Sequence, residues 1–157
     1  MTRSTSARRW AASCTGLAVA ASLVTVVVLA PTRVCAADDA VTVEMMVSYV
    51  SDDDGGIDPR GRKIHDKLRS EGFGFKSLEV LSSQRVRLAV DEVATIALPD
   101  GRKARVRPLS LSDGLLLAVD IEGGVQVDAR ARSGHLLVFS AGRYREGRLV
   151  VSVEATF

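Results

Sequence analysis

The chain of 157 residues contains little cysteine and few aromatic side chains. Its two cysteines, Cys14 and Cys35, and its single tryptophan, Trp10, all lie within the first 37 residues. Residues 38–157 therefore cannot form a disulfide, and their stability must come from packing. The lack of cysteine also restricts any zinc site there to carboxylates and the two histidines, His65 and His135.

Recognisable catalytic motifs are missing as well. No serine lies in a nucleophile-elbow sequence, and a catalytic histidine would need both an orienting partner and a nucleophile. We expect both histidines to be ordinary surface or strand-end residues. We also expect no cofactor and a protein that is not an enzyme, with a small metal-dependent hydrolase as the weaker alternative.

The segment 1–37 has the pattern of an export signal. Three arginines precede an apolar run over 16–30, and the small residues Ala36 and Ala37 behind it resemble a signal-peptidase site. This run is shorter than the roughly 20 residues that span a bilayer. We expect cleavage and export to the periplasm or the extracellular space. Retention as an uncleaved anchor is the alternative, and it would be the domain's only membrane contact.

The segment 38–157 has the size of one ordinary domain, and we expect a single domain there. The signal takes four of the 21 basic residues and none of the 19 acidic ones, which leaves 17 basic residues and a net charge of −2. Only six aromatic side chains remain for stacking on bases. A slightly acidic domain with so few aromatics is poorly suited to nucleic acid, so we expect no such partner.

Apolar and polar residues alternate along most of the domain, which predicts strands with one buried face. We expect an all-β fold of about eight short antiparallel strands in a sandwich or small barrel, with one short helix after the first strand. Asp58 and Pro59 can begin that helix and Gly72 can end it, which places it over 59–71. The expected strands cover 41–49, 75–81, 85–90, 93–98, 103–111, 115–121, 125–131, 135–139 and 148–157.

An acidic loop follows the first strand and is a candidate metal site. It places four aspartates, at positions 52, 53, 54 and 58, within seven residues. Carboxylates on a glycine-bent loop suit hard cations such as calcium, which makes Asp52, Asp54 and Asp58 candidate ligands. The spacing does not match the helix-loop-helix calcium pattern, however. The favoured interpretation is a solvated loop in which Asp58 caps the helix.

A basic stripe is the main candidate for ligand binding. Lys103, Arg105 and Arg107 occupy alternate positions, so on a strand they share one face, and Arg102 lies beside them. Arginines arrayed in this way can grip phosphate or carboxylate groups of an anionic polymer or lipid headgroup. The competing interpretation is that these charges keep an exposed strand soluble and prevent edge-to-edge aggregation.

The last strand alternates up to a terminal Phe157, which resembles the closing strand of outer-membrane barrels. The predicted segments are shorter than membrane strands of about 9 to 11 residues, and aromatic girdles are missing, so a strand of a soluble domain is favoured. The leading functional hypothesis is an interaction or assembly factor of the bacterial envelope with a protein partner. A binding module for an anionic envelope polymer or lipid headgroup is the alternative.

Overall fold

A computed structural model describes residues 40–157, so the expected export signal lies outside the described residues. This part of the chain forms eight strands and one α-helix. The strands are β1 (Val41–Ser51), β2 (Ser77–Leu88), β3 (Ala94–Ala97), β4 (Lys103–Ser110), β5 (Leu115–Ile121), β6 (Gln126–Ala131), β7 (His135–Tyr144) and β8 (Gly147–Thr156), and the helix is α1 (Arg62–Ser70). The all-β fold with one helix after the first strand is confirmed.

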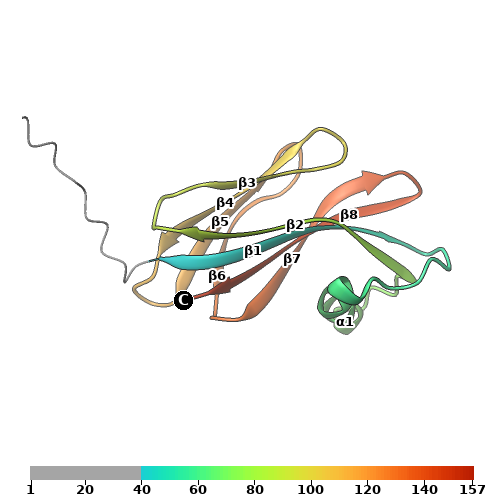
Figure 1. Ribbon diagram of the computed structural model, residues 1–157, viewed down its shortest axis with the longest axis horizontal. Helices are drawn as coiled ribbons and strands as arrows, with labels where there is room; N and C mark the ends of the chain where they lie inside the picture. Colours follow the sequence, from blue (N-terminus) through green and yellow to red (C-terminus); the bar gives the residue numbers. More distant parts are fainter. Residues whose placement is uncertain (1–39) are drawn as a thin grey trace, which may run out of the picture. The chain divides into compact units, whose positions relative to one another are not determined.

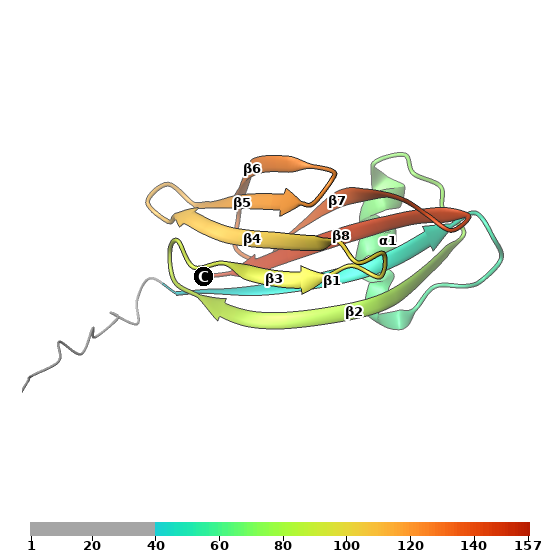
Figure 2. The ribbon, with the colours of Figure 1, turned by 90° about the horizontal axis from the view of Figure 1, so that it is seen from above.

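Two four-stranded antiparallel sheets make up the fold (Figures 1 and 2). The first sheet has the order β2-β1-β8-β7, and the second has the order β3-β4-β5-β6. The second sheet is a meander in which each strand pairs with the next one along the chain. In the first sheet the initial and final strands, β1 and β8, pair with each other and form its centre.

The two sheets pack face to face around a single main core. Every second residue of β5 is buried, and the residues between them are partly exposed, which is the alternation expected from the sequence. Burial of one face per sheet stabilises the sandwich because apolar side chains from both sheets leave water together. The fully buried members of β5 are Leu115, Leu117, Val119 and Ile121.

Helix α1 covers part of the outer face of the first sheet. It follows a 3-10 turn over Pro59–Gly61, and Asp58 caps that turn by accepting a hydrogen bond from the Arg60 backbone N–H at 2.9 Å. Ile64 and Leu68 are its buried residues, and they pack in a second, smaller core with side chains of β1, β2 and β8. The turn approaches β2 so closely that a Cβ on Gly61 would lie 2.0 Å from the Leu78 side chain. A larger residue here would require the buried Leu78 side chain to shift.

Two strand predictions need correction. The segments 75–81 and 85–90 are not separate strands but one continuous strand, β2, whose register with β1 shifts between Val47 and Ser48 of β1. The polar residues between the segments suggested a turn, yet they lie on a strand at the edge of the sheet, where polar side chains can reach water. The strand predicted over 135–139 continues to Tyr144 because a bulge at Ser140–Gly142 accommodates the break in the pattern.

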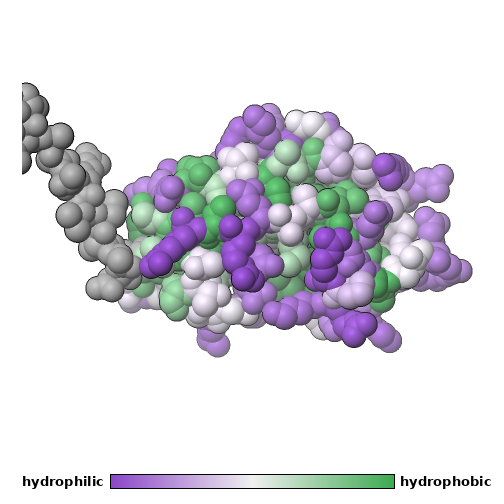
Figure 3. Space-filling view, viewed as in Figure 1, coloured by the Kyte–Doolittle hydropathy of each residue, from purple (hydrophilic) through white to green (hydrophobic). Residues whose placement is uncertain are grey.

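The surface of the domain is mainly polar. On the face seen in Figure 3, charged and polar side chains lie between the apolar ones. Five large apolar residues of the described chain are exposed, namely Ile57, Phe73, Val93, Val127 and Phe157. Single exposed apolar residues are ordinary, and only those that adjoin other unpaired groups call for an explanation.

Candidate interaction site at the edge of strand β7

The basic stripe lies on the exposed face of β4, as expected from its alternate positions. Arg105 Nη1 is 3.2 Å from Oδ2 of Asp120, its register partner on β5. Arg105 and Arg107 also line a cavity of about 400 Å³ together with Asp120 and Asp128. Carboxylates of neighbouring strands therefore lie among the cations of the stripe. Its binding of an anionic ligand stays a prediction.

Arg102, the fourth candidate of that group, is held by internal partners. Its Nε donates to Asp100 Oδ2 at 2.8 Å and its Nη1 donates to the Glu122 carbonyl at 3.0 Å. Its Nη2 donates to the carbonyl of Ala141 on β7. The hydrogen bond from Arg102 also lowers the pKa of the Asp100 carboxyl below its usual value. Arg102 thus joins two turns of the second sheet to a strand of the first.

The acidic loop does not gather its aspartates into a ligand set. Asp58 pairs with Arg60 at 2.7 Å, and hydrogen bonds from the side chain and backbone of Arg60 lower the pKa of Asp58 to about 2. Asp54 Oδ1 lies 3.5 Å from Lys76 Nζ. Asp52 instead lines a cavity beside Arg143 and Arg148. Within residues 40–157, no three histidine, cysteine or carboxylate side chains are placed to hold a metal ion. The candidate metal ligands Asp52, Asp54 and Asp58 are therefore not brought together.

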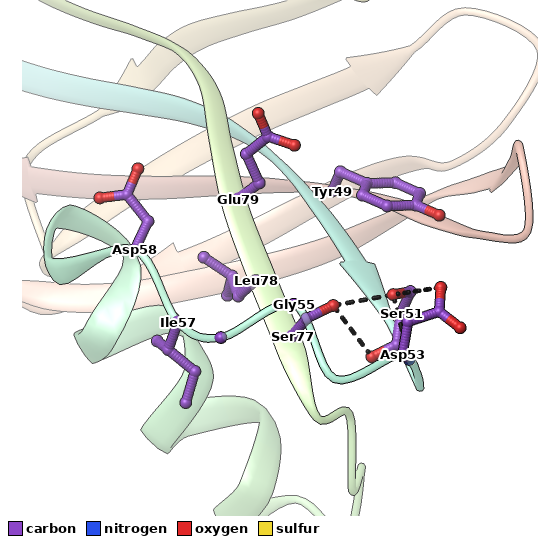
Figure 4. A pocket seen from close by; sticks show the side chains of 10 residues that line it. Tyr49, Ser51, Asp53, Gly55, Ile57, Asp58, Ser77, Leu78 and Glu79 are labelled. Carbon is purple, nitrogen blue, oxygen red and sulfur yellow. Dashed lines mark hydrogen bonds between the residues drawn. The ribbon is translucent and has the colours of Figure 1, made fainter.

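A cavity of about 560 Å³ lies where the acidic loop meets β2 (Figure 4). The Ser51 and Ser77 hydroxyl oxygens are 2.7 Å apart, and Ser51 donates to Asp53 Oδ2 at 3.1 Å. Figure 4 shows these three side chains turned toward one another, with Tyr49 and Glu79 farther along the wall. The lining offers hydroxyls and carboxylates but no histidine or lysine to take up a serine proton. These hydrogen bonds fasten the loop to the sheet.

The two histidines have different environments. His65 is largely buried, and its Nε2 lies 3.2 Å from the Phe75 carbonyl oxygen, which ties α1 to the segment that returns to β2. The expectation that both are ordinary surface or strand-end residues therefore fails for His65, which is structural. His135 is exposed at the start of β7, as expected.

Strand β7 is an edge strand with ten residues. Within the described chain it pairs only with β8, so one row of its backbone N–H and C=O groups faces away from the sheet. The bulge carbonyl of Ala141 is engaged by Arg102, which leaves 136–140 as the straight stretch of this edge. Leu136 and Val138 in that stretch are only half-buried. The edge thus combines unpaired backbone groups with accessible apolar side chains.

An apolar groove of about 130 Å³ adjoins this edge on the helix side. Leu68 from α1, Val138 from β7 and Val150 from β8 line it together with Phe73 and Phe75, and its polar lining residues are Glu71, Ser140 and Arg148. The two phenyl rings are nearly parallel, with centroids 6.2 Å apart. Phe73 leaves 48% of its surface in water, which is a large exposure for a phenylalanine beside other apolar groups.

A group of three exposed arginines lies at the tip of the β7–β8 hairpin. Arg143 and Arg148 are direct register partners, and Arg145 occupies the two-residue turn between the strands. These side chains line a cavity of about 420 Å³ with Phe75 and the carboxylates Asp52 and Glu146. We call Arg143, Arg145 and Arg148 the hairpin cluster.

Comparison with known proteins adds no functional information, because no family model, curated protein or solved structure matches this chain. Across residues 40–157, no helix combines the length and the apolar character needed to cross a membrane.

The sequence analysis missed both the apolar groove and the hairpin cluster. The groove joins Phe73 and Phe75 to Val138 and Val150, residues far apart in sequence, so no local pattern could reveal it. The cluster did leave a signal, since Arg143, Arg145 and Arg148 lie within six residues on either side of Glu146-Gly147. Arginines around Glu146-Gly147 are also typical of an ordinary polar turn, and only the extension of β7 to Tyr144 places Arg143 and Arg148 on paired strands.

Proposed function

We propose that this domain is a non-enzymatic interaction module of the bacterial envelope that binds an extended segment of a protein partner along the edge of β7. The carrying observation is the edge itself, a ten-residue strand with an unpaired side next to an apolar groove. The export-signal pattern of the first 37 residues supports placement outside the cytoplasm.

An extended polypeptide suits both the edge and the groove, because the edge can bind its backbone and the groove can bind one of its side chains. Backbone groups of β7 can continue the sheet with any incoming strand, and this pairing supplies affinity without sequence preference. Pockets for alternate side chains supply the preference. An apolar cavity of about 150 Å³ holds one benzene ring, so the groove of about 130 Å³ has room for one large apolar side chain.

The other sheet edges are less suited to strand addition. Strand β3 has four residues, and β6 has six, with Asp128 and Arg130 exposed on it. At the start of β2, the acidic loop already pairs with the edge, since Asp58 N–H donates to the Leu78 carbonyl and Leu78 N–H donates to the Gly56 carbonyl. Short, charged or covered edges are common protections against unwanted pairing. Strand β7 is longer than β3 and β6 and borders an apolar surface. Strand β2 is longer than β7, but beyond Leu78 it exposes the charged residues Glu79, Arg85 and Arg87.

A displayed library of random extended peptides would serve as the probe for this function. We expect selected peptides to slow amide exchange along 136–140 when bound. Val138→Lys places a charge in the groove, and Phe73→Ser removes an exposed anchor with little effect on folding, so each should weaken binding about tenfold or more. Val127→Lys, on the edge of β6, is the matched control and should bind as wild type does.

The proposal fails on either of two results. One is a set of selected peptides that leave the β7 amides unprotected. The other is equal binding by wild type, Phe73→Ser and Val138→Lys, with circular dichroism showing that all three proteins are folded.

A further inference from the structure

The hairpin cluster has a charge arrangement that does not favour folding. Arg143 and Arg148 are directly opposite on adjacent antiparallel strands, where like charges repel. Arg145 adopts a φ of 52°, in the left-handed region that favours glycine or asparagine. Three exposed arginines at one hairpin tip, one of them in an uncommon backbone conformation, point to a role in binding.

No carboxylate of residues 40–157 forms an ion pair with the hairpin cluster. Asp52 and Glu146 line the same cavity but lie beyond ion-pair distance. The Arg145 guanidinium lies over the Tyr144 ring, with its central carbon 5.1 Å from the ring centroid, which is a cation–π contact and not an ion pair. The cluster therefore retains donors for an anion from another molecule.

The cluster and the apolar groove form one continuous surface. Phe75 and Arg148 line both cavities, so the groove and the basic cavity are adjacent. Val138 in the groove and Arg143 in the cluster are five residues apart on β7, with the bulge between them. A segment that pairs with 136–140 would therefore continue past the arginines.

We propose that the segment docking on β7 carries carboxylate side chains about four or five residues from its apolar anchor, and that the hairpin cluster binds them. This inference rests on the proposed function and adds the chemistry of the partner. Asp52 and Glu146 in the cavity would repel a continuous polyanion that covered it. A peptide held in register by β7 can present one or two carboxylates to the arginines alone.

The test repeats the library selection on wild type and on the double variant Arg143→Gln, Arg148→Gln. Arg130→Gln with Arg132→Gln, which makes the same charge change in and just after β6, is the matched control. We expect aspartate and glutamate to be enriched at the stated distance from the apolar anchor with wild type and with the control. That enrichment should disappear with the double variant.

The contribution of the peptide carboxylate to affinity is then measured directly by comparing one selected peptide with a copy in which aspartate is replaced by asparagine. We expect the acidic peptide to bind wild type and the control about tenfold more tightly at low salt, which matches one charge-assisted hydrogen-bond pair. High salt and the double variant should each remove this difference.

The outcomes separate the two proposals. If acidic and amide peptides bind equally along β7, the partner chemistry is wrong and the proposed function stands. If no selected peptide protects β7, both are wrong. If the hairpin arginines are needed for binding vesicles that contain phosphatidylglycerol while the peptides show no preference for acids, the cluster contacts lipid and the inference is overturned.

Discussion

Two groups of basic residues illustrate how similar sequence patterns acquire different electrostatic environments. The stripe Lys103, Arg105 and Arg107 on β4 has an aspartate beside it at the register partner of Arg105. The hairpin cluster has an arginine at the register partner of another arginine. In both groups basic residues recur at short intervals, so only strand pairing distinguishes them.

The difference comes from the strand opposite each group. A β-sheet places side chains of neighbouring strands about 5 Å apart, so a charge is matched or opposed by residues distant in sequence. Strand β5 supplies Asp120 to the stripe, whereas β8 supplies Arg148 to the hairpin cluster. Arg105 of the stripe therefore has an ion-pair partner, whereas no arginine of the hairpin cluster has one within residues 40–157, which makes the hairpin cluster the stronger candidate for binding an anion from another molecule.

The largest expected effect concerns Arg102, which the sequence grouped with the stripe. Arg102→Ala removes hydrogen bonds to Asp100, the Glu122 carbonyl and the Ala141 carbonyl. Because charged hydrogen bonds at partly buried sites contribute more than neutral ones, we expect a loss of about 2 kcal/mol in the free energy of unfolding. Urea unfolding measures it, with Arg130→Ala as the control. A loss no larger than the control would show that Arg102 does not join the sheets.

Acid should weaken the same contact. The pKa of Asp100 is lowered by its hydrogen bond from Arg102, and that of Asp58 falls from 3.8 to about 2 through Arg60. A carboxyl whose pKa is lower in the folded than in the unfolded state stabilises the fold at any pH above its unfolded-state pKa. This stabilisation is lost as the pH falls from the unfolded-state pKa through the folded-state pKa. We therefore expect the melting temperature to fall between about pH 4 and pH 2. Asp100→Asn should flatten part of this decline, and an unchanged profile would contradict the assignment.

Most of the fold could be predicted from the alternation of apolar residues, because burial of one face is a local property of each strand. The alternation identified 115–121 as a strand with the correct buried face. The alternation failed to predict strand ends where pairing with a neighbouring strand decides how far a strand extends. The polar residues of β2 form a continuous ladder with β1, and β7 passes through its bulge because β8 continues to pair with it.

The candidate site was predictable only in part, because it depends on which elements meet. Asp58 was correctly expected to cap the helical segment, since a cap and its turn are adjacent in sequence. The groove needs Phe73, Val138 and Val150 together, and their proximity follows from α1 lying across the outer face of the first sheet. Strand order also makes β7 an edge strand, and local sequence patterns do not reveal strand order.

A double-mutant cycle on Arg105 and Asp120 would sharpen the contrast between the two groups. Both side chains are more than one-third exposed, so their pairing is screened by water and we expect a favourable coupling of about 0.5 kcal/mol. Arg105→Ala, Asp120→Ala and the double variant supply the cycle, measured by urea unfolding at low and high salt. The coupling should shrink at high salt. A zero coupling at low salt would leave the stripe unneutralised and make it as strong an anion site as the hairpin cluster.

The smallest expected effect has the opposite sign. Arg148→Gln removes a cation that directly faces Arg143, and the loss of that repulsion should stabilise the domain by a few tenths of a kcal/mol at low salt. The gain should disappear at high salt because the ions screen the exposed pair. Arg130→Gln, which faces Leu116 across the strands, is the control and should leave stability unchanged. A destabilised Arg148→Gln would mean that this arginine supports the hairpin, so that its position opposite Arg143 would need no binding role to explain it.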